Sequence, residues 1–572
     1  MIYGAVFRSH RQTLEENLLI FQALAQSSDQ QTINSNGPLA LTLVLGVILA
    51  GPISAGLIWL YRRAVKKSMA ARKTPVTEQP TVTVTPVGSH EKAPDFPTVE
   101  HASSTPTTTA ALELYSQLLR GPWRVAAIYV IAGCCFAFIM AAATLAGEDF
   151  TVLRLLVLFW IDAWPIVLTI NLIANASRRQ KFITVLVYFL GFVVIEALLI
   201  ITGTAPVWPA LLLWVLLNLP ATLFLLAFLN RRVRAVGPLV LIFLIAALAG
   251  PQFVISIASD QFLRLLIALG EPFGLGHGPI LAALVLSGFA MAGPIGWLTL
   301  RWIRSRYERK KISDESITLD AIWLLFGLVQ ALVLSSRGVE WLFSGIVAFA
   351  IYKLVTSFGL ALIKRKPANV KLLLLRRFSL GKESRHLFDA LAKHWRHAGS
   401  IQLIAGVDLA QDNLEPHEFL DFLSRKLARR FIDTPEALQT RLSQMDCEPD
   451  QDGRFRVNEF FCRDDTWRDV LSLLVRESKV ILMDLRGFTD QDKGCLHEIG
   501  ELVNLVPLAH VQFIVDEKTE PALLEHMQAS WNSMSSTSPN RLEVATLRLF
   551  RFTGSGVREL RELLRSLCVA AR

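Results

Sequence analysis

The last third of the chain places charged residues where predicted strands end and a predicted helix begins. Arg376 and Arg377 follow the apolar run 372–375, and Asp484 follows the run 480–483. Cations at a strand end can bind a phosphate group, or they can keep a turn in contact with water, and Asp484 has the same ambiguity. Glu498 lies near the start of the next helical segment, where a carboxylate complements the helix dipole without any catalysis.

An alternation of strand and helix patterns positions these residues. Continuous apolar runs, typical of strands buried on both faces of a parallel sheet, cover 372–375, 400–405, 480–483, 511–515 and 546–550. Helical patterns at 383–397, 466–475, 496–505, 521–531 and 556–568 separate them. The alternation predicts a doubly wound α/β domain with about five parallel strands, whose ligands bind beyond the carboxyl ends of the strands. We expect this domain, residues 366–572, to bury a complete core of its own.

Several common chemistries lack their motifs. The stretch 554–558 reads Gly-Ser-Gly-Val-Arg, so the Lys-Ser/Thr of a P-loop is absent, and no Gly-x-Gly-x-x-Gly follows the first strand. Cys495 and His497 are too close together and lack further ligands, so no metal site is predicted. The six cysteines give no disulfide framework, because four of them fall in the predicted cytosolic part.

The residues around the third predicted strand carry a resemblance to a known family. After 480–484 the chain reads Leu-Arg-Gly-Phe-Thr at 485–489 and Lys-Gly-Cys-Leu-His-Glu-Ile at 493–499. This resembles the flavodoxin-like Toll/interleukin-receptor (TIR) domain, whose third strand leads into a helix beginning with Trp-Cys-x-x-Glu. The segment 377–379, Arg-Phe-Ser, is similar to the Tyr-Ser that closes the first strand in that family. The resemblance covers about 371–572, but Gly494 replaces the Trp and an insertion, 407–464, follows the second strand.

The resemblance implies two alternative roles for the domain. In the enzymatic branch of the family the matching glutamate cleaves the nicotinamide–ribose bond of NAD, which makes Glu498 the candidate catalytic residue and NAD a candidate substrate. Arg376, Arg377, Ser379 and Asp484 are then candidate cofactor-binding residues. A carboxylate in a partly apolar cleft can hydrogen-bond ribose hydroxyls and stabilise an oxocarbenium-like transition state. Many TIR-like domains are instead non-enzymatic scaffolds, and no resident cofactor is predicted.

The first two thirds of the chain read as membrane helices. Nine apolar runs of spanning length cover 39–61, 125–145, 152–173, 182–201, 207–229, 236–257, 280–303, 317–334 and 339–363. Basic residues cluster in alternate loops, as the positive-inside rule requires. This places the N-terminus outside and the C-terminal domain in the cytoplasm of a cell membrane, which we expect to be a bacterial inner membrane. The net charge of +9 therefore reflects topology, and no nucleic-acid partner is predicted.

These features divide the chain into five parts. They are an extracytoplasmic segment (1–37), a first transmembrane anchor (38–61), a cytosolic basic and Pro/Thr-rich disordered linker (62–123), an eight-helix bundle (124–363) and the TIR-like domain (366–572). The insertion 407–464 is expected to hold a helix at 416–430 and a strand or hairpin at 454–461.

Two acidic residues, Asp162 and Glu196, interrupt the apolar runs, where an unpaired charge costs at least a few kcal/mol. They indicate either an ion path or ordinary polar contacts near an interface and between helices. Three functions follow as alternatives: a multi-pass membrane protein with a cytosolic sensing, signalling or interaction domain, a membrane-anchored NAD-hydrolysing effector, or a transporter with a cytosolic regulatory domain. The candidate partners are the lipid bilayer, a second copy of the chain and a cytosolic protein.

Overall fold

The structure is a computed structural model that describes most of the chain from residue 52 onward. The described ranges are 52–67, 94–101, 108–147, 150–174, 178–201, 207–228, 236–257, 260–270, 277–334, 337–363, 369–377, 381–405, 416–424, 431–432, 434–462, 466–541, 545–553 and 556–571, with residues 272 and 427. The predicted extracytoplasmic segment 1–37 lies outside the described residues.

The C-terminal domain is built on an eight-stranded sheet in which every neighbouring pair of strands is parallel. The five predicted strands are all present. They are β2 (Leu372–Arg376), β3 (Ile401–Ala405), β6 (Val480–Asp484), β7 (Val511–Val515) and β8 (Thr546–Arg551). They form the centre of the sheet, in the order β8-β7-β6-β2-β3. Four of them, β2, β3, β6 and β7, are buried along their whole length, as continuous apolar runs predict.

Three further strands extend this centre at both ends. On one side β1 (Thr98–His101) pairs with β8, so part of the predicted disordered linker 62–123 is ordered. On the other side β5 (Val457–Cys462) pairs with β3, and the short β4 (Phe431–Ile432) pairs with β5. Both β4 and β5 come from the insertion 407–464, which therefore continues the sheet. Edge strands are held by the backbone ladder, which explains how the polar β1 segment can form one.

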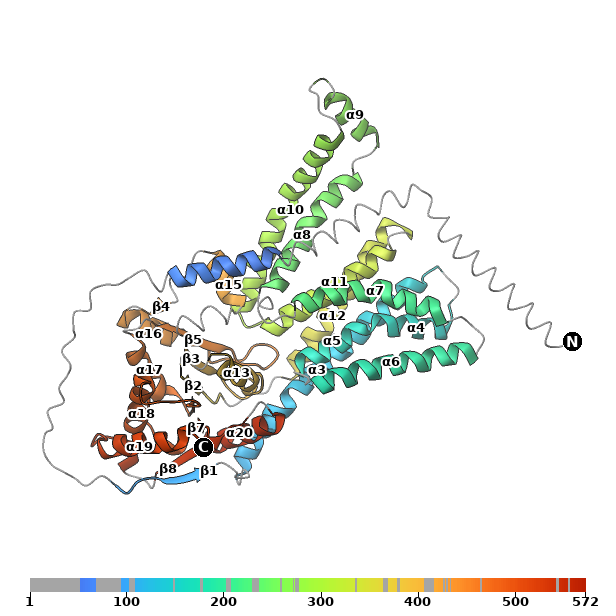
Figure 1. The fold of residues 1–572 in the computed structure, drawn as a ribbon. Coiled ribbons are helices and arrows are strands. Elements are labelled where there is room, and N and C mark those ends of the chain that lie inside the picture. The colour runs from blue at the N-terminus through green and yellow to red at the C-terminus, as the bar shows by residue number, and fades with distance from the viewer. Residues whose placement is uncertain are drawn as a thin grey trace.

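Helices cover both faces of the sheet (Figure 1). Alternate residues of each strand point to opposite faces. Leu372 and Leu374 contact α13 (Gly381–Trp395) and α20 (Val557–Ala570). Leu373 and Leu375 belong to the core beneath α16 (Pro435–Ser443), α17 (Trp467–Glu477), α18 (Lys493–Leu505) and α19 (Thr519–Asn532).

One helix belongs to two cores. The 37-residue helix α3 (Thr109–Leu145) contributes Leu114 and Leu118 to the sheet-domain core, and further along it contributes Val125 and Phe136 to the core of the membrane helices. Figure 1 shows it running from beside α20 into the group of α4–α6. The prediction that 366–572 buries a complete core of its own is therefore wrong, because α3 fills part of that core.

Within the described residues, five helices are long and apolar enough to cross a membrane. They cover Thr109–Leu145, Val152–Ile173, Arg179–Leu198, Ala282–Glu308 and Leu342–Leu362. These correspond to α3, to the consecutive α4 (Val152–Asp162) and α5 (Trp164–Ile173), to α6 (Arg178–Ile201), α10 (His277–Glu308) and α12 (Leu342–Leu362). Helices α7 (Val207–Phe228), α8 (Gly237–Ile257) and α11 (Asp314–Leu334) lie over three other predicted spans. The short α9 (Asp260–Gly270) lies between α8 and α10.

The predicted anchor 38–61 is described only from residue 52, as part of a helix that continues to residue 67. This helix does not stand apart from the domain. Tyr61 is fully buried, and its hydroxyl donates to Glu418 Oε2 at 3.3 Å on α15 (Pro416–Leu423), a helix of the insertion. The two helices lie side by side in Figure 1.

Polar side chains of neighbouring helices form hydrogen bonds with groups at the boundary between α4 and α5. Pro165 has no N–H for the carbonyl of Ile161, and Asn218 Nδ2 donates to that oxygen instead at 3.2 Å. Asp162 is buried and accepts a hydrogen bond of 2.9 Å from Gln330 Nε2. In the described part of the chain neither carboxylate oxygen of the buried Glu196 has a hydrogen-bond partner.

Candidate functional site

The predicted site lies at the carboxyl edge of the sheet, where Arg376 of β2 and Asp484 of β6 end neighbouring strands in register. Asp484 is fully buried. It accepts two hydrogen bonds from Arg486, from Nε at 2.9 Å and from Nη2 at 2.7 Å, and a third from the Ser384 hydroxyl. Its charge is thus matched inside the domain by a bidentate arginine.

Arg377 is also bound within the domain. Its Nε lies 3.0 Å from Asp492 Oδ1, and its Nη1 donates to the Gly487 carbonyl. Ser379 lies outside the described residues. The structure places Arg376, Arg377 and Asp484 at one edge of the sheet. The side chains of Arg377 and Asp484 are bonded there to other residues of the same domain.

Glu498 lies in the core between α18 and the sheet. Its side chain faces the same side of the helix as Cys495 and Ile499, and it is 3% exposed. Burial raises the pKa of Glu498 to about 8. Its Oε2 has no hydrogen-bond partner among the described residues. A carboxyl group in this setting is largely neutral at pH 7 and is held away from solvent.

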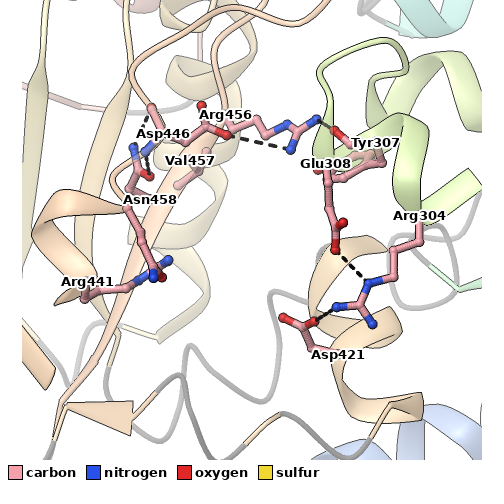
Figure 2. Close-up of a pocket in the computed structure, with 10 residues that line it drawn as sticks. Arg304, Tyr307, Glu308, Asp421, Arg441, Asp446, Arg456, Val457 and Asn458 are labelled. Atoms are coloured by element: carbon pink, nitrogen blue, oxygen red, sulfur yellow. Dashed lines mark hydrogen bonds and ion pairs between the residues drawn. The ribbon is translucent and has the colours of Figure 1, made fainter.

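A second group of charged residues lies at the opposite, amino-terminal edge of the sheet. There the residues that precede β3 and β5 meet the end of α10 and the start of α11. Figure 2 shows one of these contacts, in which Arg456 points toward Tyr307 of α10. We call this contact the junction and define it by Tyr307, Asp314, Glu315, Arg396, Asp450, Arg454 and Arg456. The sequence did not predict it.

Arg456 holds the centre of the junction. Its Nη2 donates to the Tyr307 carbonyl at 2.6 Å, and the guanidinium lies 3.6 Å from the centroid of the Tyr307 ring. The same guanidinium binds both carboxylate oxygens of Asp450, at 2.7 Å and 3.1 Å. The side chains of this pair are 8% and 0% exposed. Arg456 thus connects the insertion to the membrane helix α10 through buried, charge-assisted bonds.

Two further arginines reach the first turn of α11. Arg396 Nη2 lies 3.0 Å from Asp314 Oδ2, while the Tyr307 hydroxyl donates to Asp314 Oδ1 at 2.7 Å. Arg454 forms an ion pair with Glu315, and both side chains are buried. Acidic residues in the first turn of a helix also complement its dipole. The start of α11 is therefore fixed by cations of the sheet domain.

An outer layer of ion pairs surrounds a small cavity of about 140 Å³. Figure 2 shows Arg304 between Glu308 and Asp421, with Nε–Oε1 and Nη2–Oδ1 distances of 2.8 Å. Arg304 Nη1 also donates to Ser424 Oγ at 2.6 Å. These contacts join α10 to the insertion, as the ion pair between Lys310 and Asp446 does nearby.

Burial at the junction shifts the pKa values of its charged groups. Burial raises the pKa of Asp450 to about 7, because it outweighs the attraction of the Arg456 guanidinium. Burial and the neighbouring Arg456 lower the pKa of Lys310 to about 8. Buried ion pairs add little net stability. Removing one partner is nevertheless costly, because the remaining charge is buried without a partner and without water. The arrangement is suited to holding two parts of a protein in one specific relation.

A signal for the junction was present in the sequence. Every second residue from 446 to 456 is charged, with acidic residues at 446, 448, 450 and 452 followed by arginines at 454 and 456. The acidic pair Asp314 and Glu315 follows the basic stretch 301–311. Among the described residues, no group of three or more His, Cys, Asp or Glu is placed to hold a metal ion. The chain has no significant match to a protein-family model, to a curated protein or to a solved structure. The geometry of the chain itself therefore carries the functional conclusion.

Proposed function

We propose that this is a multi-pass membrane protein whose cytosolic α/β domain senses, signals or binds a partner protein, and that the junction couples this domain to the membrane helices. The observation that carries the proposal is the junction, in which Arg396, Arg454 and Arg456 of the domain contact α10 and α11. A domain that is merely tethered to a membrane does not need buried arginines, such as Arg396 and Arg454, whose acidic partners lie on a helix outside the domain.

The helix α3 supports the same function. Its 37 residues correspond to a rod of about 55 Å, and its two halves lie in the two cores. A change in the packing of α13 or α20 would therefore act directly on a helix that enters the membrane. Coupling through a helix shared by two cores and a set of paired charges is an established route for conformational change.

The position of the junction fits a domain that receives its signal at the far edge. Ligands of doubly wound sheets bind at the carboxyl ends of the strands, whereas the junction lies at the amino ends, roughly 16 Å away along a five-residue strand. The order β8-β7-β6-β2-β3 supports the flavodoxin-like part of the TIR resemblance, because it is the 2-1-3-4-5 order of such sheets.

The orientation and the number of spans belong to this proposal. We infer nine spans, an external N-terminus and a cytoplasmic domain in a bacterial inner membrane. The five apolar helices and the basic residues at the end of α10 support this topology. A reporter that is active only in the cytoplasm, fused at Arg572, is expected to give a signal, and its silence would contradict the topology.

Hydrogen–deuterium exchange on the full-length protein in nanodiscs tests the coupling. Glu315→Gln removes the charge that Arg454 needs, so amides of β5 and of the end of α13 are expected to exchange at least about tenfold faster. Glu525→Gln, the same change at an exposed position of α19, is the control and is expected to leave them unchanged. Faster exchange confined to α11 would contradict the proposal.

NAD hydrolysis through Glu498 is a second proposal. The pattern at 493–499 and the position of α18 directly after β6 support it, while the 3% exposure of Glu498 counts against it. The full-length protein clustered on a membrane would then consume NAD, and Glu498→Gln would reduce the rate at least about a hundredfold. NAD left untouched by the unaltered protein would retire this proposal.

Transport is the third proposal, and the buried carboxylate of Glu196 supports it, because it lacks a hydrogen bond within the described residues. Intramembrane carboxylates of this kind often serve ion pathways. A proton flux into proteoliposomes that Glu196→Gln abolishes would favour it. An equal flux in both proteins would remove Glu196 from the pathway.

A further inference from the structure

A second cavity, of about 700 Å³, lies beside the junction. Its walls come from α3, from the end of α10, from the end of α12 and from the turn 449–453 of the insertion. It lies at the level where α3 leaves the sheet-domain core at Leu118 and enters the bundle core at Val125. The cavity therefore lies at the boundary between the membrane helices and the cytosolic domain, and its volume is that of a small-molecule site.

Five cationic side chains line this cavity: Arg120, Arg124, Arg306, Lys310 and Lys311. We call it the basic cavity. Lys310 is paired with Asp446. The other four make no hydrogen bond or ion pair within the part of the chain that the structure describes. Arg306 is the most enclosed, since its Nε is buried without a partner and its guanidinium lies 5.1 Å from the Trp302 ring centroid.

The acidic residues on the cavity wall do not balance these cations. Asp450 is bound by both nitrogens of Arg456 that face it. Asp452 accepts a hydrogen bond from the backbone N–H of Arg454 at 3.1 Å. The pKa of His397, which also lines the cavity, is held well below its usual value by burial and then by Arg454 and Arg396. The excess of positive charge is therefore a property of the whole site.

We propose that the basic cavity binds the phosphate group of an anionic phospholipid from the cytoplasmic leaflet. Arginine forks match phosphate oxygens, and a phosphate here would receive donors from both α3 and α10. The membrane boundary argues for a lipid source, because Trp123 and Trp302, with exposed fractions of 57% and 55%, flank the cations at the depth where tryptophans mark interfaces. Basic sites between membrane helices on the cytoplasmic side are typical sites for such headgroups.

A headgroup in the basic cavity bridges α3, α10 and the turn 449–453, so it stabilises the junction from one side. Binding itself does not require that the junction transmit a change. A failure to bind lipid would therefore leave the proposed coupling intact, and a failure of the coupling would leave the site intact.

Thermal unfolding of the full-length protein in detergent tests the site. The protein is titrated with short-chain phosphatidylglycerol, with short-chain phosphatidylcholine and with glycerol phosphate. The test variant carries Arg120→Gln and Arg124→Gln, two exposed side chains whose loss breaks no bond in the described structure. The control carries Arg179→Gln and Lys181→Gln, which remove the same charge from the exposed start of α6.

Phosphatidylglycerol is expected to stabilise the unaltered protein and the control equally, and to bind the test variant about thirtyfold more weakly. Stabilisation by glycerol phosphate at equal strength would keep the phosphate site but assign it to a soluble ligand, overturning the lipid source. No preference for phosphatidylglycerol over phosphatidylcholine, or an equal loss in test variant and control, would overturn the site.

Discussion

The carboxyl and amino edges of the sheet differ in where the partners of their charged residues lie. At the carboxyl edge Asp484 is matched by Arg486 and Ser384, residues of the same domain. At the amino edge Arg396 and Arg454 are matched by Asp314 and Glu315, which belong to α11 in the helical bundle. Asp484 at the carboxyl edge is paired without the helical bundle, whereas Arg396 and Arg454 at the amino edge need α11 for their partners.

This difference makes the amino edge the place where the sheet domain is coupled to the helical bundle. The charges at the carboxyl edge are paired within the domain, whereas Arg396 and Arg454 at the amino edge are paired with a helix of the bundle. Buried charges that depend on a partner across an interface fix its geometry more than they add stability. The function of the chain is therefore to be sought in the relation between domain and bundle as much as in a ligand site.

The largest loss of stability is expected when the sheet domain is separated from the helical bundle. The fragment 366–572 loses the acidic partners of the buried Arg396 and Arg454. It also loses the α3 side chains Leu114 and Leu118 from its core, so it is expected not to unfold cooperatively. Circular dichroism during a urea titration measures this. Adding residues 94–123 in trans would restore only the contribution of α3 to the core, without Tyr61 and Val65 and without the partners of the arginines. Cooperative unfolding of the isolated fragment would break the comparison.

Arg456→Met tests the amino edge by a single change. It leaves the buried Asp450 carboxylate without its cation, and the free energy of unfolding of the full-length protein is expected to fall by about 3–5 kcal/mol. Equilibrium denaturation in mild detergent measures the change. Recovery in the double variant Arg456→Met/Asp450→Leu would identify the stranded charge as the cause.

The variant Glu498→Gln tests, through the pH dependence of the free energy of unfolding, whether the carboxyl group of Glu498 is buried. The folded-state pKa of about 8 lies above the ordinary value, so the stabilising contribution of the neutral carboxyl is present at low pH and is lost as pH rises toward 8. The amide cannot ionise, and the variant is expected to gain about 1–3 kcal/mol relative to the unaltered protein between about pH 5 and pH 8.5. Unfolding curves at the two pH values provide the measurement. Parallel curves would show that Glu498 is solvated.

The smallest effect is expected at an exposed pair within one helix. Arg558 and Glu562 are four residues apart on α20, with side chains 91% and 44% exposed. Removing the pair by Arg558→Gln is expected to change the free energy of unfolding by no more than about 0.5 kcal/mol. The same denaturation experiment serves as the baseline for the two variants above. A fall in the free energy of unfolding as large as that of Arg456→Met would mean that burial does not determine how much these ion pairs contribute to stability.

Local patterns were sufficient for the centre of the fold. The five apolar runs became β2, β3, β6, β7 and β8, because a strand buried on both faces has a continuous apolar sequence wherever it lies in the sheet. Edge strands have no such requirement. This is why the Pro/Thr-rich sequence around β1 predicts a disordered linker although a strand forms there.

The junction could not be predicted for a different reason. The charges of Arg454 and Arg456 are visible in the sequence, but their partners Glu315 and Tyr307 lie far away along the chain. The long α3 was also divided in the prediction, since its polar first half and its apolar second half have different patterns. Only the packing shows that one helix serves both cores.

The central claim is that the charges of the amino edge are coupled across the boundary between domain and membrane helices. A double-mutant cycle of Arg454→Gln and Glu315→Gln, followed by the free energy of unfolding of the full-length protein, measures that coupling directly. We predict an interaction energy of about 1.5–3 kcal/mol, with the double variant more stable than the two single losses would sum to. Additivity within about 0.3 kcal/mol would contradict the claim, because it would show that the domain does not depend on this contact with the membrane helices.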